Sequence, residues 1–106
     1  MTTQEQAILD RFKSLVEERV PLHQVILFGS RARGDAHPDS DMDVLVVTER
    51  AWDWDTCEFI GLCAWEAGFD ESVLVVPVVF SRDEWENGPE RSSLLALAVR
   101  SEGVPV

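Results

Sequence analysis

The sequence is poor in basic residues. It contains one lysine and nine basic residues in total against 20 acidic ones, which gives a formal net charge of −11. A general nucleic-acid-binding surface needs clustered Lys and Arg side chains to replace the counterions on phosphate. No basic stripe is present, so we expect no direct binding to nucleic acid. The charge favours a basic partner or divalent cations; the alternative is that it serves solubility alone.

Long apolar runs and paired cysteines are also missing. No run approaches the roughly 20 apolar residues that a membrane-spanning helix needs, and Met1–Asp10 lacks the basic start and apolar stretch of a signal peptide. The only two cysteines, Cys57 and Cys63, point to different sides of one predicted helix, which argues against a disulfide between them. We therefore expect a cytoplasmic protein with no membrane contact.

The apolar residues that are present suffice for a folded core. The 106 residues are 45% hydrophobic and fit one domain spanning residues 1–106. Hydrophobic periodicity predicts alternating helices and strands, and this order is typical of a small mixed β-sheet flanked by helices, an α/β fold. Pro77 cannot donate to a sheet ladder, so the strand that contains it is expected to be bulged or to lie at an edge. The predicted helices are Gln4–Arg19, Asp55–Gly68 and Pro89–Ser101, and the predicted strands are Gln24–Phe28, Asp41–Thr48, Ser72–Phe80 and a short Val104–Val106.

A polar turn after the first predicted strand suggests phosphate binding. Gly29 directly follows the strand, and Ser30 can open a helical turn whose backbone N–H groups cradle a phosphate. The Ser30 hydroxyl can donate to a phosphate oxygen, and the Arg33 side chain beside the turn can contact a triphosphate. We therefore predict nucleotide binding at Gly29, Ser30 and Arg33; the alternative is an ordinary turn.

Two carboxylates open the next predicted strand. Asp41 and Asp43 are separated by one residue, and strand alternation places both side chains on the same face. They repel each other unless a cation lies between them, and Mg²⁺ prefers such oxygen ligands together with substrate phosphates. The alternative is a solvated sheet face, but an unpartnered Asp43 beside the apolar run Val44–Val47 is costly. The turn and the Asp pair together predict nucleotidyl transfer, with Mg²⁺ bridging phosphate oxygens.

Both motifs resemble a known signature. The run Gly29–Gly34 (GSRARG) and the run Ser40–Val44 (SDMDV) resemble the G-S-x-A-R-G…S-D-x-D-hydrophobic pattern of the DNA polymerase β-like nucleotidyltransferase superfamily. The short chain resembles its minimal nucleotidyltransferase (MNT) branch. The resemblance implies that family's fold, with Gly29 and Ser30 on the nucleoside triphosphate, ATP by default. It also implies that Asp41 and Asp43 hold Mg²⁺.

The chain departs from this pattern at the third carboxylate. Active members carry one on the next central strand, but Ser72–Phe80 contains no acidic residue. Glu71, just before that strand, is the candidate third catalytic group, because a parallel crossover places it at the same end of the sheet as Asp41. The alternative is that Glu71 is a solvated loop residue. Metal and nucleotide binding thus rest on more residues than turnover does.

The acceptor must come from outside this chain. Larger transferases of the superfamily use an additional domain to hold it, and the MNT branch commonly pairs with a HEPN-domain toxin. The resemblance implies an antitoxin that transfers AMP from ATP to a tyrosine of the toxin. Alternatively, the antitoxin neutralises the toxin by contact alone. A third hypothesis is a transferase for a small acceptor of the aminoglycoside type, which requires a pocket built by a homodimer.

Two clusters of apolar side chains bear on partners. The predicted helix Asp55–Gly68 is apolar on two sides, so it is either deeply buried or meets a partner. Trp52 and Trp54 lie in a polar loop beside it, and they either belong to an interface or cap the protein's own core.

Overall fold

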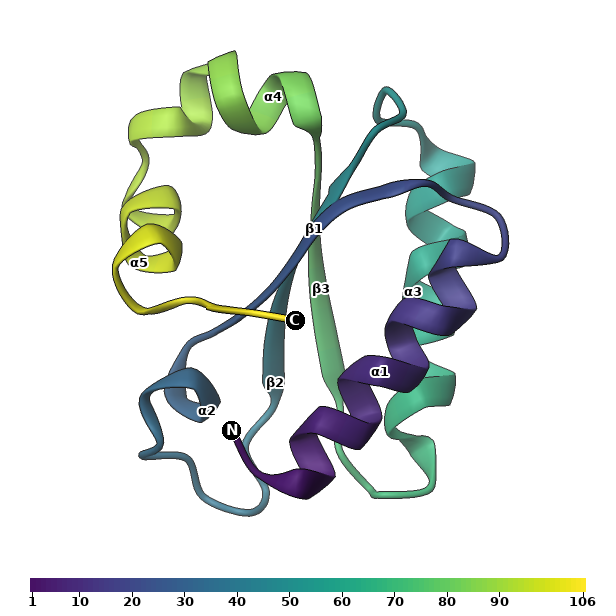
Figure 1. The fold of residues 1–106 in the computed structure, drawn as a ribbon, viewed down its shortest axis with the longest axis vertical. Coiled ribbons are helices and arrows are strands. Elements are labelled where there is room, and N and C mark those ends of the chain that lie inside the picture. Colours follow the sequence, from purple (N-terminus) through teal and green to yellow (C-terminus); the bar gives the residue numbers. More distant parts are fainter.

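The computed structural model describes residues 1–106 as a twisted sheet with helices on both faces (Figure 1). The predicted alternation of helices and strands is confirmed, with boundaries that shift by a few residues. In chain order the elements are α1 (Thr3–Glu17), β1 (Leu22–Phe28), α2 (Ser30–Arg33), β2 (Met42–Thr48), α3 (Trp54–Phe69), β3 (Val75–Ser81), α4 (Arg82–Asn87), the 3-10 helix η1 (Pro89–Ser92), α5 (Leu94–Glu102) and β4 (Val104–Pro105). No helix is long and apolar enough to cross a membrane.

The sheet has four strands in the order β3-β2-β1-β4. β1 pairs antiparallel with β2 and with β4, whereas β2 and β3 are parallel. The predicted mixed sheet is therefore confirmed. Pro77 belongs to β3, which is an edge strand, as its missing N–H group indicates.

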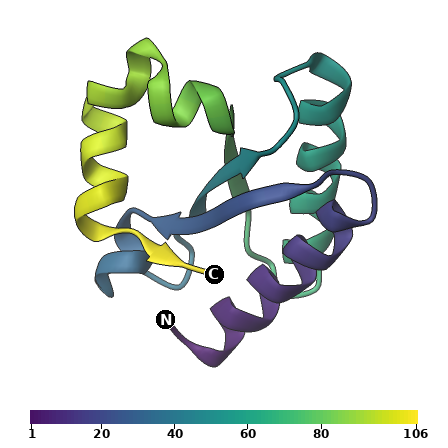
Figure 2. The ribbon, with the colours of Figure 1, turned by 45° about the horizontal axis from the view of Figure 1, so that its top comes forward.

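α1 and α3 cover one face of the sheet and enclose the larger core (Figure 2). α1 presents Leu9, Phe12 and Val16, none of them accessible to solvent. β2 meets them with every second residue, as strand alternation requires, and the larger core comprises 16 buried residues. Most of the buried apolar residues that drive folding therefore lie on this face of the sheet.

The opposite face is covered by α4, η1 and α5 and is less densely filled. Leu45 and Val47, the alternate residues of β2, pack there with Trp85 from α4 and Val99 from α5. The smaller core comprises only six buried residues. The C-terminal end of α5 lies beside α2, since Glu102 pairs there with Arg33.

The last predicted helix is divided in the structure. Pro89 opens the short η1 instead of a continuous helix, and Ser93 then caps α5 by accepting a hydrogen bond from the Ala96 N–H. A serine that bonds to the backbone two or three residues ahead favours such a new start. β3 likewise begins at Val75 and not at Ser72, because Ser72 adopts a left-handed conformation with φ 55° that ends the turn after α3.

Candidate functional site

The phosphate-type turn and the Asp pair meet at one end of the sheet. β1 ends at Phe28, which lies opposite Asp43 at the start of β2. Gly29 and Ser30 follow Phe28 directly, and ten residues then separate Ser30 from Asp41. The antiparallel pairing of β1 and β2 therefore brings the two motifs together, as expected from the sequence.

Gly29 is required at this point for two reasons. Its φ of 80° lies in the left-handed region that side chains disfavour. A Cβ atom built on it would stand 2.6 Å from Asp43 Oδ2, which is closer than real Cβ contacts allow. Gly29 also precedes α2 as its N-cap, so the predicted helical turn at Ser30 is confirmed. Within this single turn the N–H groups of Ala32 and Arg33 donate to the Gly29 carbonyl, both at 3.1 Å, so only the N–H groups of Ser30 and Arg31 lack an acceptor within the helix.

Asp41 and Asp43 form an uncompensated pair of charges. Burial of the Asp43 carboxyl and, next, the negative charge of Asp41 raise the pKa of Asp43 above its ordinary value. No ion pair of the structure involves either carboxylate. Two close carboxylates without a basic partner fit the oxygen ligands that Mg²⁺ prefers, so the residues present suit a divalent cation.

The loop that joins the two motifs is held by Arg31, whose role the sequence did not reveal. Its guanidinium is buried and donates to the Ser40 carbonyl from Nε (3.0 Å) and Nη2 (2.7 Å), and to the Pro38 carbonyl from Nη2 (3.1 Å). Ser40 immediately precedes Asp41. Arg31 thus fixes the backbone from which the Asp pair projects.

Glu5 of α1 compensates the buried charge of Arg31. Arg31 Nη1 lies 3.1 Å from Glu5 Oε2, and both side chains are almost inaccessible to solvent. Burial raises the pKa of Glu5, but the hydrogen bonds from the Thr2 backbone and from Arg31 outweigh it, so the pKa is lowered. No sequence signal joins residues 26 positions apart in this way, because the pair forms only when α1 docks.

Arg33 lies beside the turn, as predicted, and its guanidinium is engaged by acidic groups. Arg33 Nε lies 3.2 Å from Asp35 Oδ2, and Nη1 lies 3.1 Å from Glu102 Oε1 at the end of α5. These two carboxylates raise the pKa of Arg33. A phosphate at the turn would compete with Glu102 for this guanidinium.

Glu71 is not brought to the Asp pair. It lies in the loop before β3 and accepts a hydrogen bond from Gln4 Nε2 of α1 (2.9 Å). It also lines a hollow between α1 and α3, on the other face of the sheet from Asp43. No group of three or more His, Cys, Asp or Glu side chains is arranged to hold a metal. The predicted third carboxylate is therefore absent from this arrangement.

The β3 residues beside the Asp pair are apolar. Val76 lies in register with Asp43 on the neighbouring strand, and Val78 follows on the same face. Neither can serve as a base or a metal ligand. The folded site therefore consists of two carboxylates, the glycine-serine turn and the Arg33 side chain beside that turn.

Comparison with known proteins places the chain in a family. Residues 9–96 match the nucleotidyltransferase domain family. No curated protein matches the chain.

Among solved structures, similar folds occur in toxin–antitoxin complexes. One was crystallised with AMP-PNP; its matching chain is 22% identical, covers 91% of this chain and 69% of its own length, and gives a TM-score of 0.62. A second contains a tri-AMPylated Shewanella oneidensis HEPN toxin with its MNT antitoxin; it is 19% identical over 97% of this chain and 71% of its own, with a TM-score of 0.57. A mutant MntA–HpeT complex gives 18% identity, coverage of 98% and 72%, and a TM-score of 0.63.

These structural likenesses establish the fold, and the family match spans most of the sequence. The expected polymerase β-like nucleotidyltransferase fold is thereby confirmed. This chain belongs to the nucleotidyltransferase domain family.

Proposed function

We propose that this chain transfers a nucleoside monophosphate, AMP from ATP, to a hydroxyl group of a protein partner, as the MNT antitoxin of a HEPN/MNT pair. The observation that carries the proposal is the close approach of Gly29 to the Asp43 carboxylate, since it puts a phosphate-type turn directly beside a metal-type carboxylate. Two similar complexes support it: one was crystallised with AMP-PNP and one contains an AMPylated HEPN toxin.

In this proposal each side chain has a stated task. Asp41 and Asp43 hold Mg²⁺, the backbone at Gly29 and the Ser30 hydroxyl donate hydrogen bonds to the triphosphate, and Arg33 pairs with a phosphate oxygen. When bound, Mg²⁺ neutralises charge on the phosphate oxygens. Arg31 keeps Asp41 and Asp43 in place by holding the Ser40 carbonyl.

The transfer itself is a displacement at phosphorus. The acceptor hydroxyl oxygen bonds to the α-phosphorus of ATP, the bond to the bridging oxygen breaks, and pyrophosphate leaves. The hydroxyl proton passes to solvent, because no third carboxylate lies beside the pair. The chain's contribution is then positioning and electrostatic stabilisation.

The test is intact mass spectrometry of the partner. The protein encoded by the adjacent gene is incubated with this chain, Mg²⁺ and ATP, with Asp43→Asn as the control variant. A mass gain of one adenylate with the wild type and none with the control is the expected result. No gain at any enzyme concentration would refute transfer to this partner.

A contact antitoxin is the second candidate function, and one observation favours it. Val76 stands in register with Asp43 where a catalytic carboxylate would complete the site. Under this alternative Asp43→Asn still neutralises the toxin in growth assays, whereas under the transferase proposal neutralisation is lost.

A further inference from the structure

A continuous apolar surface remains uncovered on the outside of α3. It consists of Leu62, Trp65 and Phe69 on α3 and Leu74 just before β3, which we call the α3 patch. These side chains are 63%, 60%, 64% and 48% exposed. The α3 residues follow the i, i+3, i+7 spacing of one helix face, opposite the face that Ile60, Cys63 and Ala67 bury in the core. α3 therefore has two apolar faces. One is buried in the core, and the other, the α3 patch, is exposed.

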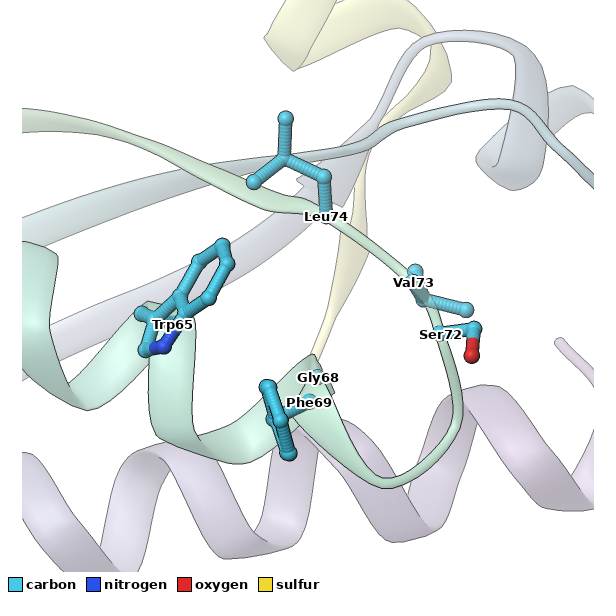
Figure 3. Close-up of a pocket in the computed structure, with 6 residues that line it drawn as sticks. All are labelled: Trp65, Gly68, Phe69, Ser72, Val73 and Leu74. Carbon is cyan, nitrogen blue, oxygen red and sulfur yellow. The ribbon is translucent and has the colours of Figure 1, made fainter.

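The α3 patch contains two hollows. Trp65, Gly68, Phe69, Val73 and Leu74 line a pocket of about 290 Å³ (Figure 3). A second hollow of about 490 Å³ shares Trp65 and Phe69 and extends along α3. The centroids of the Trp65 and Phe69 rings are 5.8 Å apart, and both residues line both hollows. Aromatic side chains beside pockets are typical of the centres of protein interfaces.

Gly61 provides a separate indication that something approaches this face. It lies inside α3, where glycine is less favourable than alanine. A Cβ atom built there would meet no other atom of the chain, so the fold itself does not need a glycine at this position. Gly61 stands one turn before Trp65 on the helix surface. A close approach by another molecule would explain it.

The charges around the patch indicate the chemistry of its occupant. α3 carries three acidic residues and no basic one, and Asp70 and Glu71 follow directly. The one basic side chain lining the hollows, Arg11, is already paired with Glu66. A second copy of this chain would oppose like charges here, whereas a partner with basic residues around an apolar centre would complement them.

The patch is continuous with the candidate site. The Leu74 carbonyl accepts a hydrogen bond from the N–H of Met42, the residue between Asp41 and Asp43 (2.9 Å). In Figure 3 the Leu74 side chain points away from α1 and α3, and thus toward the other face of the sheet. A partner lying on the patch would therefore reach around the free edge of β3 to the Asp pair. Pro77 in that edge hinders addition of a strand, so docking relies on side chains.

We propose that the α3 patch, Leu62, Trp65, Phe69 and Leu74, is the docking surface for the protein acceptor, which contacts it with an apolar centre surrounded by Lys and Arg. The inference rests on the proposed function for the identity of the bound protein as an acceptor. It assigns to α3 the positioning of the acceptor that the transfer needs.

The experiment measures binding and transfer separately. The chain is titrated against the purified protein of the adjacent gene by biolayer interferometry, and adenylation is followed by intact mass. Trp65→Ala is expected to weaken binding at least tenfold, and Trp54→Ala, an equally drastic change at an exposed tryptophan elsewhere, to change it less than twofold. Asp43→Asn should bind normally. Gly61→Ala should raise the Tm and still weaken binding, which a merely structural role would not produce.

Each outcome decides the proposal. Normal binding by Trp65→Ala overturns it, whether or not adenylation occurs. Wild-type binding without adenylation refutes the transferase but leaves the docking surface supported if Trp65→Ala weakens that binding. Absence of any wild-type complex overturns the docking surface together with the protein acceptor. A wild-type homodimer that Trp65→Ala converts to monomers in sedimentation also overturns it, because a second copy then covers the patch.

Discussion

The two faces of the sheet differ in how they are filled and in what they carry. The α1/α3 face holds 16 mutually packed buried residues, and the α4/α5 face holds six. The Asp pair, the glycine-serine turn and Arg33 all belong to the thinly covered side or its rim. A well-packed face supplies the stability that allows unfavourable charges to persist on the other. Arg31 and Glu5 connect the two, since one reaches the site loop and the other belongs to α1.

We expect the largest effect of a single substitution at Asp43, which lies on the thinly covered face. Asp43→Asn should lower transfer about 100- to 1000-fold, as is usual for loss of one preorganised electrostatic group. Its thermal stability should be equal or higher, because burial and Asp41 disfavour the Asp43 charge in the folded chain. Adenylation rates and calorimetric Tm values are compared with those of Asp39→Asn, an exposed acid of the same loop. A lower Tm for Asp43→Asn would show that the carboxylate stabilises the fold instead.

A leucine-to-alanine substitution on each face compares how much the two cores contribute to the free energy of unfolding. Leu9→Ala empties a fully buried position of the larger core and should cost about 3 to 4 kcal/mol of unfolding free energy. Leu95→Ala, at a half-buried leucine beside the smaller core, should cost about 1 kcal/mol. Urea denaturation measures both. Equal costs would mean that the two faces contribute alike.

The connection between the faces is tested at Arg31. Arg31→Met leaves the buried Glu5 carboxylate without a basic partner and should cost about 3 kcal/mol, most of which Glu5→Met in the same chain restores. The pH dependence has a definite sign. The folded chain lowers the pKa of Glu5, so its contribution is full above the ordinary Glu pKa and is lost as the pH falls toward the lowered value. An Arg31→Met variant with unchanged acid stability would contradict this role.

The smallest expected effect concerns Glu102. Glu102→Gln frees Arg33 from one of its two carboxylates and should tighten ATP binding up to about threefold, as befits an exposed ion pair. Calorimetric titration with Mg²⁺ and ATP measures it. Glu90→Gln is the matched control, because it changes the net charge equally on exposed η1. Weaker binding by Glu102→Gln would show that Glu102 positions Arg33 for phosphate.

Local patterns predicted the elements that local forces determine. The edge position of the strand with Pro77 and the helical turn at Ser30 follow from single residues and their neighbours. The free cysteines also agree with the sequence-based expectation. The break before Ser93 was missed because its capping bond competes with helix continuity, which periodicity alone does not register.

The site was predictable only where its parts are close in sequence. The meeting of Gly29 with Asp43 follows from an antiparallel pair and a short loop. For Glu71 the sequence predicts only the end of the sheet and not the face, because a loop residue has no strand alternation to fix its direction. The partnership of Arg31 with Glu5 and that of Arg33 with Glu102 depend on how α1 and α5 dock. Such contacts are tertiary and leave no periodic trace.

For Trp52 and Trp54 the sequence leaves two alternatives open, an interface with a partner or a cap over the protein's own core. Their rings are 4.9 Å apart in an edge-to-face arrangement, and both remain exposed, 40% and 79%. They therefore do not cap the core. The two-sided helix predicted from the sequence is confirmed as well, since α3 buries one side and exposes the other.

The grip of Arg31 on two carbonyls also has a dynamic consequence. Because one guanidinium holds both Pro38 and Ser40, the site loop cannot loosen at one of these points without weakening the other. We expect residues 34–41 to open as one unit, with a single free energy of local opening well below that of global unfolding. Amide hydrogen exchange would then report one common opening free energy across the loop, set by a side chain that is itself anchored to Glu5 of α1.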